Sequence, residues 1–284
     1  MCGIEGHCQL KKFYTVKDEA SFDTIAFSLK ATSSTCFVHL ADNENPLTIY
    51  GNPSLSEVNP TFHTNIKNKT NKVDLHLEDY NQKGLSQAIS YSMFGNENSE
   101  KNYWKVFLTN QKIYDLDLKY GVGDAFVNLS DLAVSKFKIE SGSANVKVIY
   151  DDRSTNKCAM DTFYVNVDVG NLITKNVNKS NAKIVIADVG FGTAVLDFGK
   201  GVKEHCKINV SVGAGKLKII LPENNFPAIV SFKSSPLCNI ALDQGFEQVS
   251  DHVYVNRSYS ADAPNLMEFN VDVALGNITF EYAK

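Results

Sequence analysis

The sequence predicts an all-β protein whose strands stack as a β-solenoid of the parallel β-helix type. Three observations predict it: apolar and polar residues alternate from residue 105 onwards, glycine interrupts each alternating run, and the interruptions recur at a regular spacing. In one run Phe163, Val165 and Val167 alternate with polar residues, and Gly170 follows. Period-two alternation is typical of a strand with one buried face, and glycine is typical of a tight corner.

The spacing of the glycines predicts the repeating unit. We take Gly123, Gly142, Gly170, Gly192 and Gly215 as equivalent corners, which lie 19, 28, 22 and 23 residues apart, a mean of 23. Periods of roughly 20–30 residues are typical of solenoid coils, because one coil cannot bury its apolar face without a neighbour. We therefore expect one coil for each corner.

We expect the repeats to fill residues 111–284. Within them, segments 166–174 and 270–279 are nearly identical, which predicts the same position in the coil for both. Before the repeats we expect an N-terminal extension over residues 1–20 and a less regular, β-containing cap over residues 21–110 that covers the open end of the stack. Cap and repeats are expected to form one continuous unit.

Patterns within the cap are weaker. Strands are expected over residues 21–32, 34–42 and 46–53. Loops rich in Asn, Pro, Lys and Gly are expected over residues 51–72 and 95–102. The sequence predicts at most one short helix, in residues 84–94, where apolar residues keep helical spacing.

Composition excludes several classes of protein. Hydrophobic residues make up 43% of the 284 residues and charged residues 21%, which is typical of a globular chain and not of a disordered one. With 28 basic and 32 acidic residues the net charge is −4, so nucleic acid is not an expected partner. The longest apolar run is four residues, Ile184 to Ala187, so we expect no transmembrane span.

The sequence names no catalytic, cofactor-binding or metal-binding residue. The glycine motifs at 121–126, 190–195 and 213–218 lack the third glycine of a dinucleotide fingerprint and lead into strands instead of helices. The dense group formed by Cys2, Glu5, His7 and Cys8 fits no common zinc spacing. For this group we favour a local disulfide or a frayed terminus over a metal site, and we expect no cofactor.

Outward-facing carboxylates have two interpretations. They are Asp115, Asp117, Asp168, Asp188, Asp197 and Asp272. Polysaccharide-cleaving enzymes built on a β-helix place such carboxylates in a groove, at separations that suit acid and base catalysis. A strand face in water also needs polar side chains, and this explanation requires no further assumption. We therefore favour the solvated face over catalysis, and equally over a calcium site.

The strand and corner motifs resemble a known family. The segments that carry the resemblance are 116–148, 184–198 and 208–222, with an L-x-L-x-x-G-x-G corner and the strand end Asn128-Leu-Ser-Asp-Leu132. They resemble the adhesin-type domains of bacteria called toast-rack domains, a family of unknown function. The resemblance covers residues 110–284 well and implies stacked β-coils in the cell envelope. The family has no known catalytic residues to transfer.

The functional expectation follows from these points together. We expect a non-enzymatic, adhesin-like envelope protein that presents a surface for protein, glycan or self-association. The alternatives are a carbohydrate-active β-helix enzyme and a ligand-sensing module of an envelope-stress regulatory system. The resemblance implies an extracytoplasmic location (periplasm or cell surface) with the leader peptide removed, although a cytoplasmic protein with a native Met1 stays open. It also allows a lipid anchor at Cys2 and a Cys2–Cys8 disulfide.

Overall fold

The computed structural model describes residues 12–52, 58–79, 103–222, 226–234 and 236–283. All of the regular structure in these residues is β, apart from one 3-10 turn at Val177–Ser180. The strands form a single hydrogen-bonded network of 18 strands, β1 to β18. The predicted all-β class is therefore confirmed, while the helix predicted in residues 84–94 lies outside the described residues.

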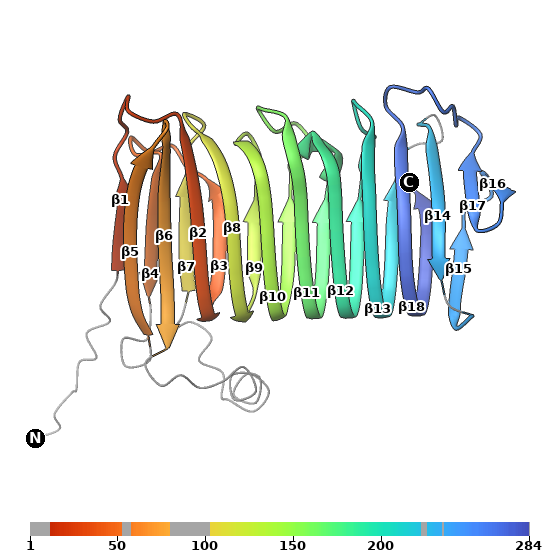
Figure 1. Ribbon diagram of the computed structural model, residues 1–284, viewed down its shortest axis with the longest axis horizontal. Coiled ribbons are helices and arrows are strands. Elements are labelled where there is room, and N and C mark those ends of the chain that lie inside the picture. The colour runs from red at the N-terminus through yellow and green to blue at the C-terminus, as the bar shows by residue number, and fades with distance from the viewer. Residues whose placement is uncertain (1–11, 53–57, 80–102, 223–225, 235, 284) are drawn as a thin grey trace, which may run out of the picture.

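Five long strands form the centre of the molecule (Figure 1). They are β10 (Ala133–Ile149), β11 (Met160–Lys175), β12 (Ala182–Asp197), β13 (Cys206–Leu221) and β18 (Met267–Tyr282). Each pairs in parallel with the next in this order, over almost its whole length. The result is a stack in which one residue of each strand lies beside the equivalent residue of its neighbours.

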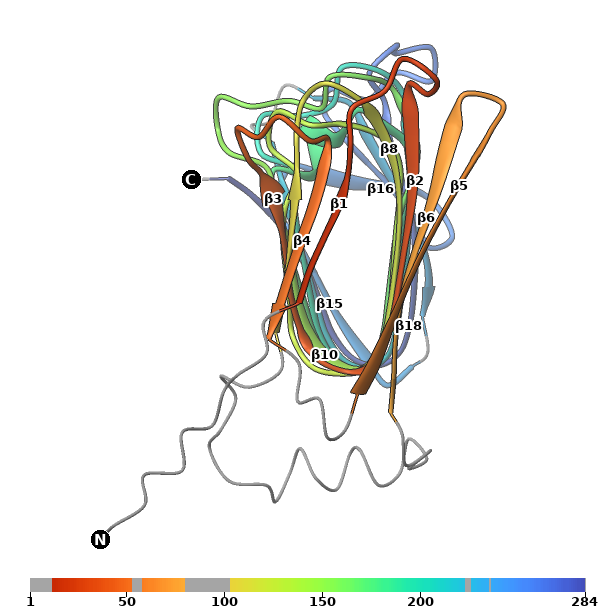
Figure 2. The same ribbon diagram turned by 90° about the vertical axis from the view of Figure 1, so that its left-hand side faces the viewer.

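Each long strand bends in its middle, so the stack has two walls joined at a closed corner (Figure 2). The first halves of the long strands form the first wall. It continues at the N-terminal end through β8 (Ile113–Val122), β2 (Thr24–Ser33), β6 (Thr70–Asp79) and β5 (Val58–Lys67). At the C-terminal end it continues through β14 (Ala228–Ser234), β17 (Val253–Asn256) and β16 (Phe246–Ser250).

The second halves of the long strands form the second wall. It continues at the N-terminal end through β9 (Ala125–Asn128), β3 (Thr35–Leu40), β7 (Tyr103–Leu108), β4 (Leu47–Asn52) and β1 (Lys12–Val16). At the C-terminal end it gains β15 (Cys238–Leu242). Each long strand therefore contributes its first half to one wall and its second half to the other.

The corner between the walls depends on glycine. Gly170, Gly192, Gly215 and Gly276 occupy one row of the ladder, with φ between 135° and 150°. A Cβ atom on Gly192 would lie 1.7 Å from the carbonyl oxygen of Gly170, so this position accepts only glycine. The glycine corners predicted from the sequence are confirmed at Gly170, Gly192 and Gly215 and at Gly123, which has a φ of 134°.

Two details of the predicted repeat are wrong. Ala144, and not Gly142, pairs with Gly170 in the corner row, so β10 turns without a positive φ. Gly276 shares the row of Gly170, but Asn270 pairs through β13 and β12 with Tyr164 and not with Asn166. The two similar segments are thus in register only after the corner, because the second has two extra residues before its glycine.

The core lies between the walls. Inward-facing side chains of both walls meet there, and aromatic pairs such as Phe137 with Phe163, 5.0 Å between ring centroids, link neighbouring levels. Phe269 contacts both Phe198 and Phe280 edge to face at 5.4 Å. Alternation places every second residue of each wall in this core, and this arrangement leaves the other half to face solvent.

Strands also occupy part of the region predicted as a loop. Residues 58–67 and 70–79 form the antiparallel pair β5 and β6, so the predicted loop over residues 51–72 is wrong there. Outer strand β5 includes Pro60, a residue without the N–H that a further strand would need. Residues 95–102 lie outside the described residues, and the division of the chain at residues 20 and 110 stays a prediction.

Loops opposite the corner are fixed by buried amides. Asn156 is 3% exposed; its Nδ2 donates to the carbonyl oxygens of Val134, Cys158 and Ser180, and its Oδ1 accepts from the Val134 N–H. One side chain thus satisfies backbone groups of several neighbouring segments. No helix within the described residues is long and apolar enough to cross a membrane.

Candidate functional site

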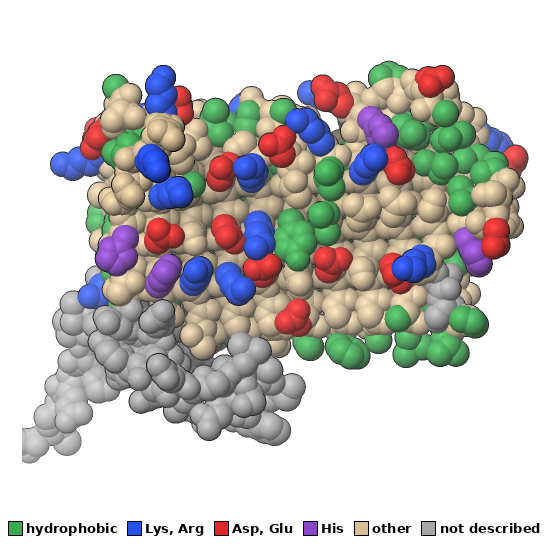
Figure 3. Space-filling view, in the orientation of Figure 1, with side chains coloured by type: hydrophobic (Ala, Val, Ile, Leu, Met, Phe, Trp, Pro, Cys, Tyr) green, Lys and Arg blue, Asp and Glu red, His purple; other side chains and the backbone are tan. Residues whose placement is uncertain are grey.

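Charges of both signs alternate over the outer face of the first wall (Figure 3). The acidic residues are Asp74, Asp115, Asp117, Glu140, Asp188, Glu268 and Asp272. The basic residues are Lys30, Lys72, Lys119, Lys136, Lys138, Lys207 and Lys233. A face with interspersed charges is well solvated and produces no strong field of one sign.

Ion pairs neutralise part of this face. The carboxylate of Glu140 lies 3.2 Å from Nζ of Lys138 and 3.5 Å from Nζ of Lys119. Burial raises the pKa of Glu140, but its hydrogen bond with Lys138 and the charges of both lysines outweigh this, so the pKa is lowered. Glu140 is therefore held ionised and is unsuited to donate a proton as a general acid.

The six carboxylates predicted to face outward lie in different places. Asp115, Asp117, Asp188 and Asp272 belong to the first wall, Asp168 lies beside the corner, and Asp197 belongs to the second wall. In the first-wall ladder, Asp188 and Asp272 pair with opposite sides of Ser211. They are thus two strand spacings apart, roughly 9.6 Å.

Such spacing is at or beyond the separations used by glycoside hydrolases, about 5–5.5 Å for retaining and about 6.5–9.5 Å for inverting enzymes. A hollow of about 460 Å³ in the first wall is lined by Glu140 and Asp168, and a separate hollow of about 340 Å³ is lined by Asp188 and Asp272. Glu140 stays ionised there beside two lysines. Neither Glu140 nor the pair formed by Asp188 and Asp272 therefore has the features of an acid and base pair.

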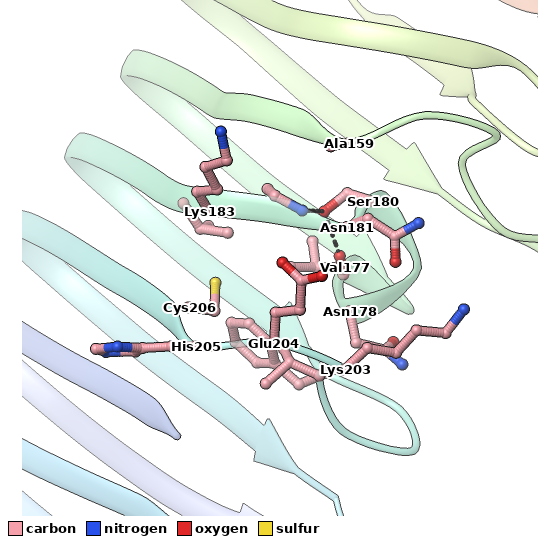
Figure 4. Close-up of a pocket in the computed structure, with 14 residues that line it drawn as sticks. Ala159, Val177, Asn178, Ser180, Asn181, Lys183, Lys203, Glu204, His205 and Cys206 are labelled. Carbon is pink, nitrogen blue, oxygen red and sulfur yellow. Dashed lines mark hydrogen bonds between the residues drawn. The ribbon is translucent and has the colours of Figure 1, made fainter. Parts of the chain in front are cut away.

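A smaller hollow of about 190 Å³ lies among the loops opposite the corner (Figure 4). The 3-10 turn supplies Val177 and Ser180, the segment before β13 supplies Glu204 and His205, and β13 begins with Cys206. Glu204 points into the hollow, while His205 points away from it to the carboxylate of Glu268, 3.2 Å distant. This volume is below the roughly 300–1,000 Å³ of typical small-molecule pockets.

The nucleophilic groups of this hollow are not activated. Burial raises the pKa of the Cys206 thiol to about 12, so the thiol is protonated at neutral pH. The Ser180 hydroxyl donates to the Val177 carbonyl oxygen at 2.6 Å and accepts from the Ala182 N–H at 3.2 Å. Both groups thus act in the structure of the turn, and neither meets a base that could activate it.

The outer face of the second wall has a different composition. Its ladder positions carry few acids, namely Asp124, Asp197 and Glu281. They carry the amides Asn128, Asn145, Asn171, Asn239 and Asn277, and the lysines Lys105, Lys147, Lys175, Lys216 and Lys218. Toward the N-terminal end they carry the aromatic residues Phe13, Phe37, Tyr50, Tyr103, Phe107 and Phe126.

A row of hydrogen-bonded amides crosses this wall immediately after the corner. Asn171 donates from Nδ2 to Oδ1 of Asn145 at 2.8 Å, and Asn145 donates from Nδ2 to Oδ1 of Asp124 at 3.1 Å. Both asparagines are exposed. Asp124 directly precedes β9, and Asn145 and Asn171 lie on β10 and β11, so the side chains form a ladder that runs along the stack and across the strands.

An apolar row runs beside the amide row. Phe126, Lys147 and Ile173 occupy one ladder row, two residues further along each strand. Phe126 is 41% exposed and Ile173 45% exposed, and Phe37 stacks on Phe126 at 5.3 Å between centroids. We call the two rows together the second-wall strip: Asp124, Asn145, Asn171, Phe126, Lys147 and Ile173.

Residues of the strip were not among the sequence-predicted candidates. Their signal in the sequence is the polar residue that directly follows each corner position, as in Gly123-Asp124, Ala144-Asn145 and Gly170-Asn171. The cluster predicted from Cys2 to Cys8 lies outside the described residues. Within the described residues, Cys36, Cys158 and Cys206 are free, and no group of three or more His, Cys, Asp or Glu could hold a metal.

One family model matches part of the chain. Residues 46–170, which run from the start of β4 to the corner of β11, match the N-terminal domain of toast_rack, DUF2154. No curated protein matches the chain. The matched segment contains the first two levels of the second-wall strip, with Asp124 and Asn145, and ends just before Asn171.

Solved structures of low identity were also found. A "putative cell adhesion protein" of Clostridium sporogenes is 14% identical with a TM-score of 0.48, over 96% of this chain and 99% of that one. A "putative adhesin" of Bacteroides fragilis is 13% identical with a TM-score of 0.32, over 96% of both chains. A "putative lipid binding protein" of Parabacteroides distasonis is 11% identical with a TM-score of 0.33, again over 96% of both. Residues 46–170 thus match a toast-rack domain, which confirms the predicted resemblance for this part of the chain.

Proposed function

We propose that this protein is a non-enzymatic, adhesin-like binding protein of the bacterial cell envelope, which holds its partner on the second wall. In this proposal each bent strand with its loop is one coil of a β-solenoid, and the stack serves as a rigid support. The location is extracytoplasmic. The observation that carries the proposal is the contrast between a wall on which charges of both signs alternate and a wall with few acids that carries amides, lysines and exposed apolar and aromatic side chains.

Two physical reasons support binding by the second wall. Exposed apolar side chains such as Phe126 and Ile173 gain free energy when a partner covers them, since apolar surface is then removed from water. Exposed amides such as Asn145 and Asn171 donate and accept hydrogen bonds, and they cost less to desolvate than charged groups. Recognition surfaces commonly combine these two types of side chain.

Co-sedimentation with isolated bacterial cell walls tests the proposal. We expect the purified protein to sediment with the walls, and Phe126→Ser combined with Ile173→Ser to reduce the bound fraction at least fivefold. The matched control is Tyr164→Ser combined with Ile186→Ser, which removes a neighbouring aromatic and aliphatic pair from the first wall. Equal loss from both double variants, or loss from neither, would contradict the assignment of binding to the second wall.

Protease accessibility tests the location. In intact cells that express the protein from its own gene, an extracytoplasmic protein is degraded by added protease once the outer barrier is permeabilised. A cytoplasmic protein stays intact until the inner membrane is lysed. Protection until lysis would show that the proposed location is wrong without affecting the binding measurement on the purified protein.

A further inference from the structure

We propose that the second-wall strip binds a linear β-1,4-linked glycan, whose chain runs along the rows and therefore across the strands. This inference rests on the proposed function and names the class of ligand. Its starting point is the ladder of Asp124, Asn145 and Asn171, in which each side chain already contacts the next. A ligand that lies along this ladder meets the same kind of group at every level.

The row of polar side chains continues beyond the hydrogen-bonded ladder. Its members at successive levels are Asp124, Asn145, Asn171, Thr193, Lys216 and Asn277. Adjacent strands in a sheet lie about 4.8 Å apart. The sugars of an extended β-1,4-linked glycan recur at a slightly longer interval, and successive sugars are turned by about half a rotation, so the same sugar edge recurs close to every second strand over a few levels.

The neighbouring row can contact the apolar faces of a sugar ring. Phe126, Ile173 and Val195 present apolar groups two residues from the polar row. A pyranose ring has C–H groups on its faces and hydroxyls around its edge, so a chain between the rows can place C–H groups on one row and hydroxyls on the other. Lys147, between Phe126 and Ile173, adds a donor for ring or carbonyl oxygens.

A polypeptide fits this surface less well. Side chains on one face of an extended peptide recur every two residues, about 6.6–6.8 Å, which does not match a row spacing of about 4.8 Å. Strand addition is also blocked in the strip, because both edges of β10 and β11 there are already paired with neighbouring strands. Periodicity and pairing together favour the glycan.

Isothermal titration of the full chain with defined oligosaccharides tests the inference. The probes are chitohexaose, its disaccharide chitobiose, and maltohexaose, whose α-1,4 linkages give a curved chain. We expect chitohexaose to bind at least tenfold more tightly than chitobiose, because more levels of the strip are occupied. Maltohexaose is expected to bind at least tenfold more weakly than chitohexaose, because its sugars lose register with the strands.

Paired amide variants locate the site. Asn145→Ala with Asn171→Ala removes the exposed amide pair of the strip and should weaken chitohexaose binding about tenfold. The matched control is Asn209→Ala with Asn270→Ala, which removes an exposed amide pair joined at 3.1 Å on the first wall and should change binding less than twofold. Phe126→Ser provides a second variant from the apolar row, and circular dichroism verifies that each variant is folded.

The outcomes separate this inference from the proposed function. If chitohexaose does not bind, or if maltohexaose binds as tightly, the glycan inference is wrong. Should co-sedimentation with cell walls then still depend on Phe126 and Ile173, the binding role of the second wall stands with another ligand. If co-sedimentation is also independent of these residues, both proposals fail.

Discussion

The two walls consist of the two halves of the same strands, yet their outer faces differ. In β10 the first half turns Lys136, Lys138 and Glu140 outward, and the second half turns Asn145 and Lys147 outward. The inner faces of both halves are apolar. The difference between the walls therefore does not come from the fold, since the ladder and the core treat both halves alike.

This comparison separates the side chains that specify the stack from those that are free to vary. Inward residues and corner glycines are constrained by packing and by backbone geometry. Outward residues need only keep the protein soluble, and the alternating charges on the first wall meet that need. A wall that instead exposes Phe126 and Ile173 accepts a cost in solubility, and binding is the physical benefit that we propose for it.

The largest expected effect concerns the glycine corner that joins the two walls. Gly192→Ala should lower the free energy of unfolding by at least about 3 kcal/mol, since the added Cβ would meet the Gly170 carbonyl at a φ of 146°. Gly142→Ala is the control, because Gly142 lies outside the corner row and has no positive φ; it should change stability by less than about 0.5 kcal/mol. Urea unfolding measures both, and equal effects would contradict the assigned corner row.

A second prediction separates structural amides from those available for binding. Asn156→Ala should lower the free energy of unfolding by about 2–3 kcal/mol, since buried backbone groups of the loops lose their partner. Asn145→Ala with Asn171→Ala should change it by less than about 1 kcal/mol, because these exposed side chains can bond to water instead. A large loss of stability in the exposed pair would mean that the strip is structural.

Much of the fold could be predicted from the sequence because the signal is local. Alternation with period two indicates which residues of β11 and β13 face the core, and glycine marks the bend. Register is not local: whether Gly142 or Ala144 pairs with Gly170 depends on how β10 is aligned with β11. The strands β5 and β6 were missed because Asn, Thr and Lys on an outer hairpin resemble a loop in composition.

The strip could be predicted only in part. The polar residue after each corner position is visible in the sequence, but its position beside the equivalent residues of neighbouring strands needs the register of the ladder. Carboxylates are candidates in a sequence because they can act as acids and bases. Glu140, the acid with two lysine partners, was not among the six predicted. Amides such as Asn145 give no comparable signal, since asparagine is equally common in turns and solvated faces.

The smallest expected effect lies within the first wall and concerns pH. Glu140 and Asp188 occupy one ladder row, on either side of Asn166, with opposite pKa shifts. The pKa of Glu140 is lowered, because the Lys138 hydrogen bond and the lysine charges outweigh the effect of burial. The pKa of Asp188 is raised by burial. Ionised Glu140 therefore stabilises the folded state, and ionised Asp188 destabilises it.

Two substitutions measure these contributions at pH 7. Glu140→Gln should lower, and Asp188→Asn should raise, the free energy of unfolding, each by less than about 1 kcal/mol because both sites contact solvent. The Glu140 contribution is present above the unfolded pKa near 4.5 and is lost as the pH falls through the lower folded value. The Asp188 penalty is absent below the unfolded pKa near 3.8 and grows as the pH rises through the higher folded value. If both substitutions changed the free energy of unfolding in the same direction, the charges of the first wall would not be balanced as this comparison of the two walls requires.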